Sequence, residues 1–410
     1  MRIFYNFGIW LYYIAACIFS LFNSKAKKWL TGQKDIFNYI KNSDIKQHKI
    51  AWFHAASLGE FEQGRPVIEL FRQNNPDIKI LLTFFSPSGY EVRKNYEYAD
   101  YICYLPLDTY SKAKKFIDIV NPEIVFFIKY EFWFNYLKIL YGRNIDTYLI
   151  SGIFRSQQHF FKFYGFWFRE QLKNFSFFFL QNKESEELLK SIGFTNLKIS
   201  GDTRFDRVFQ IAQNPKSFPL IQQFKAASPL VLLGSSWEAD EAVLMDFIRE
   251  NAGKIKFIIA PHEVHTDRIT SLKNSIQNRV ILLSELNENN FNANDILIIN
   301  NIGMLSHLYQ YADVAYIGGG FGKGIHNILE AACFGIPTIF GPNYQKFSEA
   351  KELISLNSSF CINNKNELKN ALNDLLSDKN IYNKAKINSL EYINNKRGAS
   401  KIILESIKNL

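Results

Sequence analysis

Short apolar runs alternate with segments of helical period along most of the chain after residue 48. In the first half they read KIAWFHA, IKILLTFF, YICYLPL, EIVFFIKY, TYLIS, FSFFFLQ and LKISG, and in the second half PLVLLGS, KFIIAP, VILLSE, DILIIN, VAYIGGG and PTIFGP. Strands that are apolar at nearly every position, with helices between them, are typical of parallel sheets covered on both faces. The pattern therefore predicts two doubly wound α/β domains in tandem.

One stretch interrupts this alternation. Residues 213–229 (QNPKSFPLIQQFKAASP) hold three prolines and few strand formers, which predicts a linker. We expect an N-terminal α/β domain over 25–212 and a C-terminal α/β domain over 230–410, with terminal helices after residue 364. Because open α/β sheets bind ligands beyond the carboxyl ends of their strands, a cleft between the two sheets is the expected site.

The N-terminus is a candidate membrane segment. Residues 3–22 hold no charge, and Lys25, Lys27 and Lys28 follow them. The first fifty residues contain eight Lys or Arg and two Asp, a bias that favours a cytoplasmic membrane face with anionic lipid. We expect residues 1–24 to be an uncleaved anchor, and leave open whether it spans the membrane or lies in it. The rival, a lipoprotein signal ending at Cys17, is disfavoured because the apolar run continues past that cysteine.

Composition narrows the class of partner. The 410-residue chain has a net charge of +9, with 38 Phe and 21 Tyr, which suits anionic partners. Nucleic acid is the least supported of these, because no RNP-like signature, zinc pattern or arginine-rich arm is present. The four cysteines are far apart and lack CxxC spacing, so we expect reduced thiols in a cytosolic compartment.

Two acids follow strands of the first half. Glu60 stands where KIAWFHA turns into a helix, and Glu131 follows EIVFFIKY. An isolated first-turn acid is explained by the helix dipole, at about 0.3–1 kcal/mol. Two carboxylates at neighbouring strand ends can instead divide base and electrostatic roles, and spacing alone leaves both interpretations open. Arg204, in GDTRFDR, suits a phosphate or a surface network with the nearby aspartates.

A histidine pair follows a strand of the second half. In IIAPHEVHTDR, Pro261 and His262 come just after the strand. The H-E-x-H spacing differs from the H-E-x-x-H of zinc sites, and the sequence offers no clear third ligand. We therefore expect no metal and no other cofactor.

The glycine-rich stretch from Ile317 to Pro342 (IGGGFGKGIHNILEAACFGIPTIFGP) is the strongest signal. A strand that ends in glycines before a helix leaves backbone N–H groups for an anion, usually a phosphate. His326 and Asn327 can cap that helix, Glu330 can accept from ribose hydroxyls, and Gly335 with the proline at 337 ends it. An ordinary tight turn explains the glycines alone, but the full context favours a nucleotide phosphate.

These motifs together resemble the 3-deoxy-D-manno-octulosonic acid (Kdo) transferases of lipopolysaccharide biosynthesis. The matching segments are HAASLGE, LLTFFSPSG, YLPLD, IKYEFWFN, GDTRFD, GSSWEADE, APHEVH, IGMLSHLYQYADVAYIGGGF, GIHNILEAACFGIPTIFGP and the apolar N-terminus followed by KKWLTGQKD. The resemblance implies a GT-B glycosyltransferase with two Rossmann-like domains facing a cleft. It also implies anchoring at the cytoplasmic face of the inner membrane and transfer of Kdo from CMP-Kdo to a lipid A precursor.

The resemblance also assigns residues by motif. Glu60 corresponds to the proton acceptor, and Glu131 and Arg204 to groups that stabilise the transition state. The CMP site corresponds to Pro261, His262, Gly303, Met304, Leu305, Asn327, Ile328, Leu329 and Glu330, and the glycine turn adds Gly319 and Gly320. The chain departs from the family pattern at Asp202, Arg204, His262, Met304 and Ile328. At His262 a neutral imidazole replaces arginine and binds phosphate more weakly.

Two rival functions differ in what they require. A sugar-nucleotide epimerase of the same double fold needs no membrane segment and releases free product. A non-catalytic, membrane-bound nucleotide-sugar binding protein tolerates loss of both Glu60 and Glu131.

Overall fold

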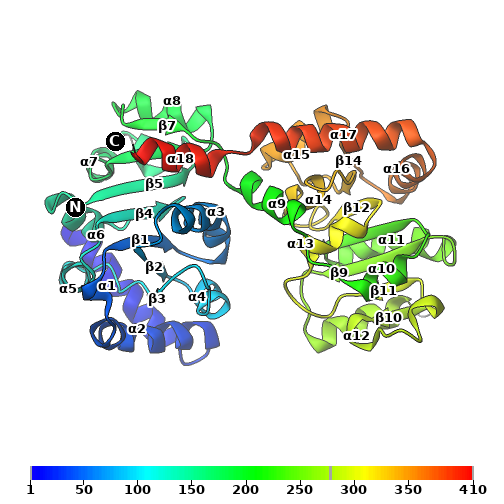
Figure 1. The fold of residues 1–410 in the computed structure, drawn as a ribbon, viewed down its shortest axis with the longest axis horizontal. Coiled ribbons are helices and arrows are strands. Elements are labelled where there is room, and N and C mark those ends of the chain that lie inside the picture. Colours follow the sequence, from blue (N-terminus) through cyan, green and yellow to red (C-terminus); the bar gives the residue numbers. More distant parts are fainter. Residues whose placement is uncertain (1, 277–278, 409–410) are drawn as a thin grey trace. The chain divides into compact units, whose positions relative to one another are not determined.

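The computed structural model describes residues 2–276 and 279–408, which form two compact units (Figure 1). Unit 1 comprises residues 1–207 and 397–410, and unit 2 comprises residues 208–396. Each unit holds one seven-stranded parallel sheet with helices on both faces, which confirms the predicted α/β class. Helix α9 (Arg204–Gln213) carries the chain from the first unit into the second.

The sheet of unit 1 has the strand order β3-β2-β1-β4-β5-β6-β7. All seven predicted strands form, and β1 and β4 are buried along nearly their whole length. Their bounds are β1 (Ile50–Ala55), β2 (Lys79–Phe84), β3 (Tyr101–Tyr104), β4 (Ile124–Ile128), β5 (Asp146–Gly152), β6 (Phe177–Leu180) and β7 (Leu197–Ile199).

Helices cover both faces of this sheet. One face buries a core shared with α2, α5 and α6, and the other a core shared with α3. The helices are α1 (Arg2–Phe19), α2 (Ser24–Asn42), α3 (Leu58–Asn74), α4 (Pro87–Arg93), α5 (Tyr110–Val120), α6 (Phe134–Gly142), α7 (Phe166–Leu172), α8 (Lys183–Ser191) and α18 (Ala399–Lys408).

The sheet of unit 2 has the strand order β10-β11-β9-β8-β12-β13-β14. The six predicted strands form, and a seventh, β14, was not predicted because its three residues lie in a polar segment. The strands are β8 (Leu230–Ser236), β9 (Lys256–Pro261), β10 (Val280–Leu282), β11 (Ile296–Ile298), β12 (Val314–Ile317), β13 (Thr338–Phe340) and β14 (Ser359–Cys361). The helices are α10 (Pro219–Lys225), α11 (Glu238–Glu250), α12 (Thr266–Ile276), α13 (Leu305–Leu308), α14 (Leu329–Ala332), α15 (Ser348–Ser355), α16 (Lys365–Ser377) and α17 (Lys379–Lys396).

The unit boundaries differ from the predicted domains in two places. The expected linker contains α10, whose Ile221 and Phe224 are buried within unit 2. The last helix, expected with the C-terminal domain, packs on α3 in unit 1 and buries Ile403. Asp206 fixes the start of this helix, because its carboxylate accepts from the amides of Gly398 and Ser400 at 2.5 and 2.7 Å. Local pattern predicted the helix but could not indicate the sheet to which it returns.

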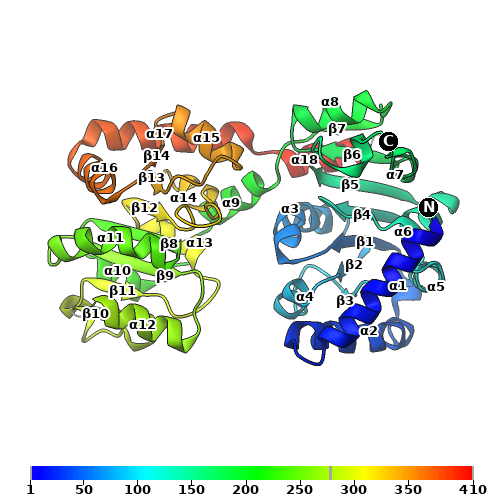
Figure 2. The same cartoon turned by 180° about the vertical axis from the view of Figure 1, so that it is seen from behind.

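Helix α1 lies along unit 1 toward α2 (Figure 2). It is long and apolar enough to cross a membrane, with a mean hydropathy of 1.3 over 18 residues. One stripe of the helix packs on the first core through Tyr5, Ile9, Tyr13 and Ala16. Its N-terminal end is held because the Tyr5 hydroxyl donates to Asp108 at 2.5 Å and Arg2 donates to Asn135 at 3.1 Å. The other faces expose large apolar side chains, among them Ile3, Phe4, Phe7 and Trp10.

Candidate active site

The centre of the first sheet is the point where the strand order reverses. Strand β1 pairs with β2 on one side and β4 on the other, so the crossovers leave in opposite directions and open a ligand site beyond the carboxyl ends of these strands. Glu60 lies in the first turn of α3, directly after β1, and Glu131 lies three residues after β4. The fold thus puts both predicted carboxylates at the switch point.

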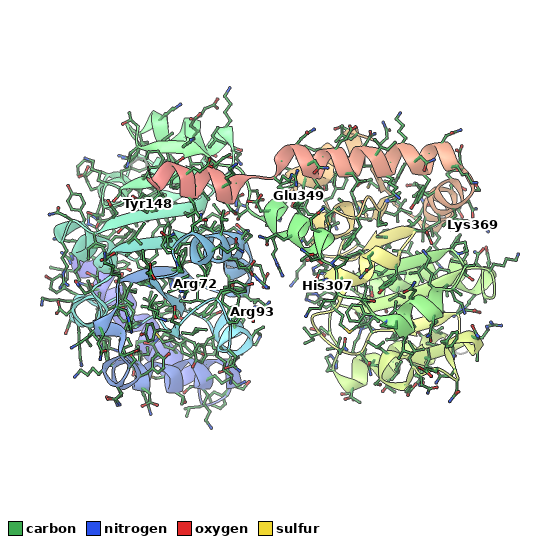
Figure 3. The ribbon with its side chains drawn as sticks, in the orientation of Figure 1. Arg72, Arg93, Tyr148, His307, Glu349 and Lys369 are labelled. Atoms are coloured by element: carbon green, nitrogen blue, oxygen red, sulfur yellow. The ribbon has the colours of Figure 1, made fainter. Side chains whose placement is uncertain are left out.

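Glu60 differs from the acids around it. Glu62, two residues further along α3, accepts a hydrogen bond of 2.6 Å from Arg93 on α4, a residue that Figure 3 labels. Glu62 also lies near Arg65. Glu69 pairs with Arg65 at 2.6 Å. Within the described residues Glu60 forms no salt bridge, and it accepts a short hydrogen bond from the Ser57 hydroxyl. It is half-buried, so its carboxylate remains available to accept a proton.

Glu131 is buried and fixed. Its Oε2 atom accepts from Trp133 Nε1 at 2.6 Å and lies 3.2 Å from Nε2 of His54, an imidazole without solvent exposure. The other ring nitrogen of His54 lies 2.8 Å from the Thr83 hydroxyl, so a hydrogen-bonded row runs from β2 through β1 to Glu131. With one oxygen already engaged, Glu131 is suited to orient its neighbours and to supply a fixed negative charge.

Arg204 begins α9 and is held by Asp202. Its Nε donates to Asp202 Oδ2 at 2.8 Å, and its backbone amide donates to the same carboxylate at 2.9 Å. The intervening Thr203 donates to the carbonyl of Gln63 on α3 at 2.5 Å, which ties this turn to the helix that carries Glu60. Arg204 is therefore oriented by a carboxylate, and its charge is partly neutralised.

Lys129, which the sequence analysis did not single out, also lies at the carboxyl ends of the strands of the first sheet. It follows β4 and adopts a left-handed backbone, with φ of 72°, a conformation that side-chain-bearing residues adopt at a cost and that clusters at functional sites. Burial lowers the pKa of Lys129, while Glu60 acts in the opposite direction and Arg204 reinforces the lowering. Its Nζ lies 5.2 Å from the Tyr130 ring centre, and the Arg155 guanidinium lies 5.8 Å from the same ring. The sequence feature that could have identified Lys129 is its position between an apolar strand and Glu131.

At the second switch point, between β8 and β12, the glycine turn is built differently from the prediction. The amide of Gly319 donates to Asp240 Oδ2 at 2.8 Å, and the amides of Gly318, Gly322 and Gly324 donate to backbone carbonyls. These four N–H groups are therefore occupied within the protein and do not face an anion. The glycines are required for close packing, because a Cβ on Gly319 would collide with the Gly324 carbonyl and one on Gly320 would lie 2.5 Å from the Gly341 amide.

The segment after the glycines forms only one helical turn, α14, where a longer helix was expected. Asn327 caps it as predicted: its Oδ1 accepts from the Leu329 amide at 3.3 Å, and its side-chain amide donates to Glu330 at 3.0 Å. Ile328 and Leu329 have buried side chains, so only their backbone is suited to contact a ligand. Gly335 has φ of 72° and ends the turn, as predicted. With four residues, α14 offers an anion a much weaker dipole than a full helix.

Three rings gather where β8, β9 and β12 end. Trp237 stacks on His262 with ring centres 4.6 Å apart, and His262 stacks on His326 at 4.4 Å. Trp237 Nε1 donates to His326 Nε2 at 3.1 Å, and burial, followed by His262, lowers the pKa of His326. This arrangement keeps His326 neutral with its proton on Nδ1. The predicted His262 is exposed and Pro261 is buried, whereas Trp237 was missed.

The remaining predicted nucleotide contacts lie in the loop after β11. Gly303 has φ of 94° and is exposed, and Met304 and Leu305 begin the short helix α13. The first amides of such a turn have no intrahelical acceptor, which suits ligand contact. His307 on this helix, labelled in Figure 3, accepts from the Lys216 amide at 3.2 Å. No cluster of three or more His, Cys, Asp or Glu suited to a metal occurs among residues 2–276 and 279–408.

The two Rossmann-like sheets and their switch-point sites define a two-domain α/β protein of the GT-B type. Solved structures with this fold include a putative UDP-N-acetylglucosamine 2-epimerase from Listeria monocytogenes, with 14% identity, a TM-score of 0.61 and coverage of 88% of this chain and 96% of that one. The UDP-GlcNAc 2-epimerase from Neisseria meningitidis bound to UDP-GlcNAc has 14% identity, a TM-score of 0.59 and coverage of 88% and 100%. At this identity the likeness concerns the fold alone.

Sequence relatives share one activity. Residues 32–207 match the model of the 3-deoxy-D-manno-octulosonic-acid transferase (kdotransferase) family. The enzyme of that name from Aquifex aeolicus is 27% identical over 355 residues, which cover 83% of this chain and 90% of the relative. The one from Haemophilus influenzae is 23% identical over 405 residues, 96% and 94% of the two chains. Residues 32–207 therefore match the Kdo transferase family, the chain is similar to Kdo transferases over most of its length, and these relatives support a glycosyltransferase.

Proposed function

We propose that this protein transfers Kdo from CMP-Kdo to a lipid A precursor, with inversion at the anomeric carbon and without a metal ion. The observation that carries the proposal is the half-buried Glu60 at the first switch point. Unlike Glu62 and Glu69 it forms no salt bridge in the described part of the chain, and it lies within the electrostatic reach of Lys129. A carboxylate in this state is suited to act as a general base.

In the proposed step, Glu60 accepts the proton of an acceptor hydroxyl while the hydroxyl oxygen attacks the anomeric carbon of Kdo. The bond from that carbon to the CMP phosphate oxygen breaks, and CMP leaves with the electron pair. Kdo and the donor phosphate are both anionic, so the cations Lys129 and Arg204 offset the charge that moves during transfer. The Glu131–His54 row keeps this edge rigid.

Unit 2 is proposed to bind the donor nucleotide. Because the amides of Gly318, Gly319, Gly322 and Gly324 are occupied, the phosphate contacts are assigned to the loop at Gly303, Met304 and Leu305 and to the backbone at Asn327 and Ile328. Glu330 is assigned to the ribose hydroxyls. The rings of Trp237, His262 and His326 offer a flat surface on which a base can stack, at about 1–3 kcal/mol per base.

We further infer that α1 lies in the cytoplasmic surface of the inner membrane and does not cross it. Its polar end is bonded to Asp108 and Asn135, and one stripe of the helix is packed on the unit 1 core, so a spanning position would require these contacts to break. The exposed apolar side chains, with Lys25, Lys27 and Lys28 next to them, suit an interfacial helix on anionic lipid.

The proposal is tested by incubating the purified protein with CMP-Kdo and a phosphorylated, acylated glucosamine disaccharide, followed by mass analysis of the lipid. A mass increase of one or more Kdo units is the expected result. Consumption of the sugar nucleotide with release of free sugar and an unchanged lipid would contradict it and would favour an epimerase-type reaction.

A further inference from the structure

An apolar pocket of 390 Å³ lies in unit 1 between α1, α2 and the loop after β2. Its volume is at the lower end of the range of small-molecule sites, about 300–1,000 Å³. The lining is mainly hydrophobic and includes Tyr12, Ala15, Phe19, Trp29, Phe85 and Pro87. The rings of Tyr12, Trp29 and Phe85 contact one another, with centres 5.5–5.9 Å apart, and therefore form a fixed wall.

The pocket is continuous with the exposed apolar end of α1. Phe19 belongs to both, and Leu21 and Phe22, which follow it, are 76% and 88% exposed. Lys25 and Asn23 also line the pocket and supply the polar groups. Apolar surface that leads into an apolar pocket beside an ammonium suits an amphiphile with an alkyl chain and an anionic head.

Phe85 and Ser86 connect the pocket to the candidate catalytic residues. Phe85 contacts Trp133 at 4.8 Å, and Trp133 donates to Glu131 at 2.6 Å. The amide of Ser86, also in the lining, donates to the Ala56 carbonyl at 2.7 Å, and Ala56 directly precedes Ser57, the hydrogen-bond partner of Glu60. The pocket is therefore linked to Glu131 through Phe85 and Trp133, and to the turn that carries Ser57 and Glu60 through Ser86.

Trp29 contributes its ring to the pocket and has an unsatisfied donor. Its side chain is 4% exposed and lines the pocket, yet its indole N–H has no acceptor among the described residues. A buried donor without an acceptor is costly, and native proteins rarely leave one unsatisfied. Because this N–H is itself buried, a ligand in the pocket would contact the ring of Trp29 and not this donor.

We propose that this pocket binds one acyl chain of the acceptor lipid and selects acylated over deacylated acceptors. The inference rests on the proposed function, which names a lipid acceptor, and adds the residues that recognise its chain. Each methylene withdrawn from water favours binding about four-fold, so a few methylenes in the pocket are sufficient for strong discrimination.

The test uses the full chain and two acceptors, a phosphorylated glucosamine disaccharide with acyl chains and the same disaccharide without them. Ala15→Trp fills the pocket from an exposed position of α1. Gly8→Trp is the matched control, because a Cβ there meets no atom within 4 Å. We expect Ala15→Trp to raise KM for the acylated acceptor more than about ten-fold, with unchanged kcat and unchanged binding to anionic vesicles. Gly8→Trp should leave all three values at the wild-type level.

A second measurement does not depend on turnover. An acylated disaccharide with a photoreactive group near the end of one chain should label peptides containing residues 12–19 or 85–87, and Ala15→Trp should abolish the label. Labelling confined to other peptides, or an equal effect of Ala15→Trp on both acceptors, would overturn the inference. If neither acceptor receives Kdo, the proposed function fails, and the labelling alone decides whether the pocket binds the chain.

Discussion

The two units share one architecture but have different chemistry at the same topological point. At the β1/β4 switch point unit 1 presents charged groups: Glu60, Lys129 and Arg204, with buried Glu131 behind them. At the β8/β12 switch point unit 2 presents stacked rings and a glycine turn in which four amides are already bonded. The sheet order thus determines where a site forms, and the side chains at the strand ends determine what the site can do.

The difference also concerns rigidity. In unit 2 the buried carboxylate of Asp240 accepts from the amides of Trp237 and Gly319 at 3.0 and 2.8 Å, and thereby joins the ends of β8 and β12. In the described part of unit 1 Glu60 has no such bond to a neighbouring strand, and it remains half-buried. This contrast suits a unit that holds a ligand and a unit that transfers a proton.

The largest effect is expected at the charged edge. Glu60→Gln keeps the shape but removes the base, so transfer should fall by about 10²–10⁴-fold while CMP-Kdo binding stays near the wild-type value. Glu62→Gln, in the same helical turn, is the control and should retain transfer. Transfer kinetics and titration with CMP-Kdo check the two variants. Retained transfer in Glu60→Gln would show that the switch point of unit 1 does not supply the base.

In unit 2 the strongest effect should concern stability. Gly319→Ala forces a Cβ against the Gly324 carbonyl in a left-handed conformation, so we expect a loss of about 2–5 kcal/mol in unfolding free energy. Gly303→Ala has a similar φ but open space, and should lose only about 1–2 kcal/mol. Urea unfolding measures both. Equal losses in the two variants would show that the close contact at Gly319 adds nothing to the cost of the left-handed backbone.

A smaller effect is expected at Lys129. Lys129→Met keeps the aliphatic stem and removes the charge beside Glu60, so transfer should fall about ten-fold, equivalent to about 1.4 kcal/mol. Lys129→Arg restores the charge and should recover part of the rate. Steady-state kinetics of the two variants test this, and a fully active Lys129→Met would show that the positive charge has no role in the first unit.

The smallest effect is a pH dependence of unit 2. Burial and His262 lower the pKa of His326 below its ordinary 6.5, so the unfolded chain takes up a proton before the folded one. The contribution of His326 to stability is therefore complete above pH 6.5 and is lost as the pH falls through the folded pKa. His326→Gln should show a smaller drop in Tm between about pH 7.5 and 5.5. An unchanged drop would indicate that the ring stack does not hold His326 neutral.

Much of the candidate site could be predicted because it lies at strand ends. Glu60, Glu131 and His262 each follow an apolar run, and carboxyl ends of parallel strands share one edge of a sheet. Lys129 and Trp237 occupy the same kind of position and were missed, since a single Lys or Trp after a strand is common and carries no spacing signal. Their importance is evident only from the strained backbone of Lys129 and the rings stacked near Trp237.

The sequence by itself determined every strand but β14 in the described residues, the two-domain α/β class and the resemblance to Kdo transferases, because periodicity and motifs are local properties of the chain. Tertiary structure decided which groups meet. It directed the Gly319 amide to Asp240, returned α18 to unit 1, docked one stripe of α1 on the core, and formed the pocket between Tyr12 and Phe85. The physical reason is that each of these contacts joins segments far apart in the chain, and the order in which strands enter the sheet brings such segments together.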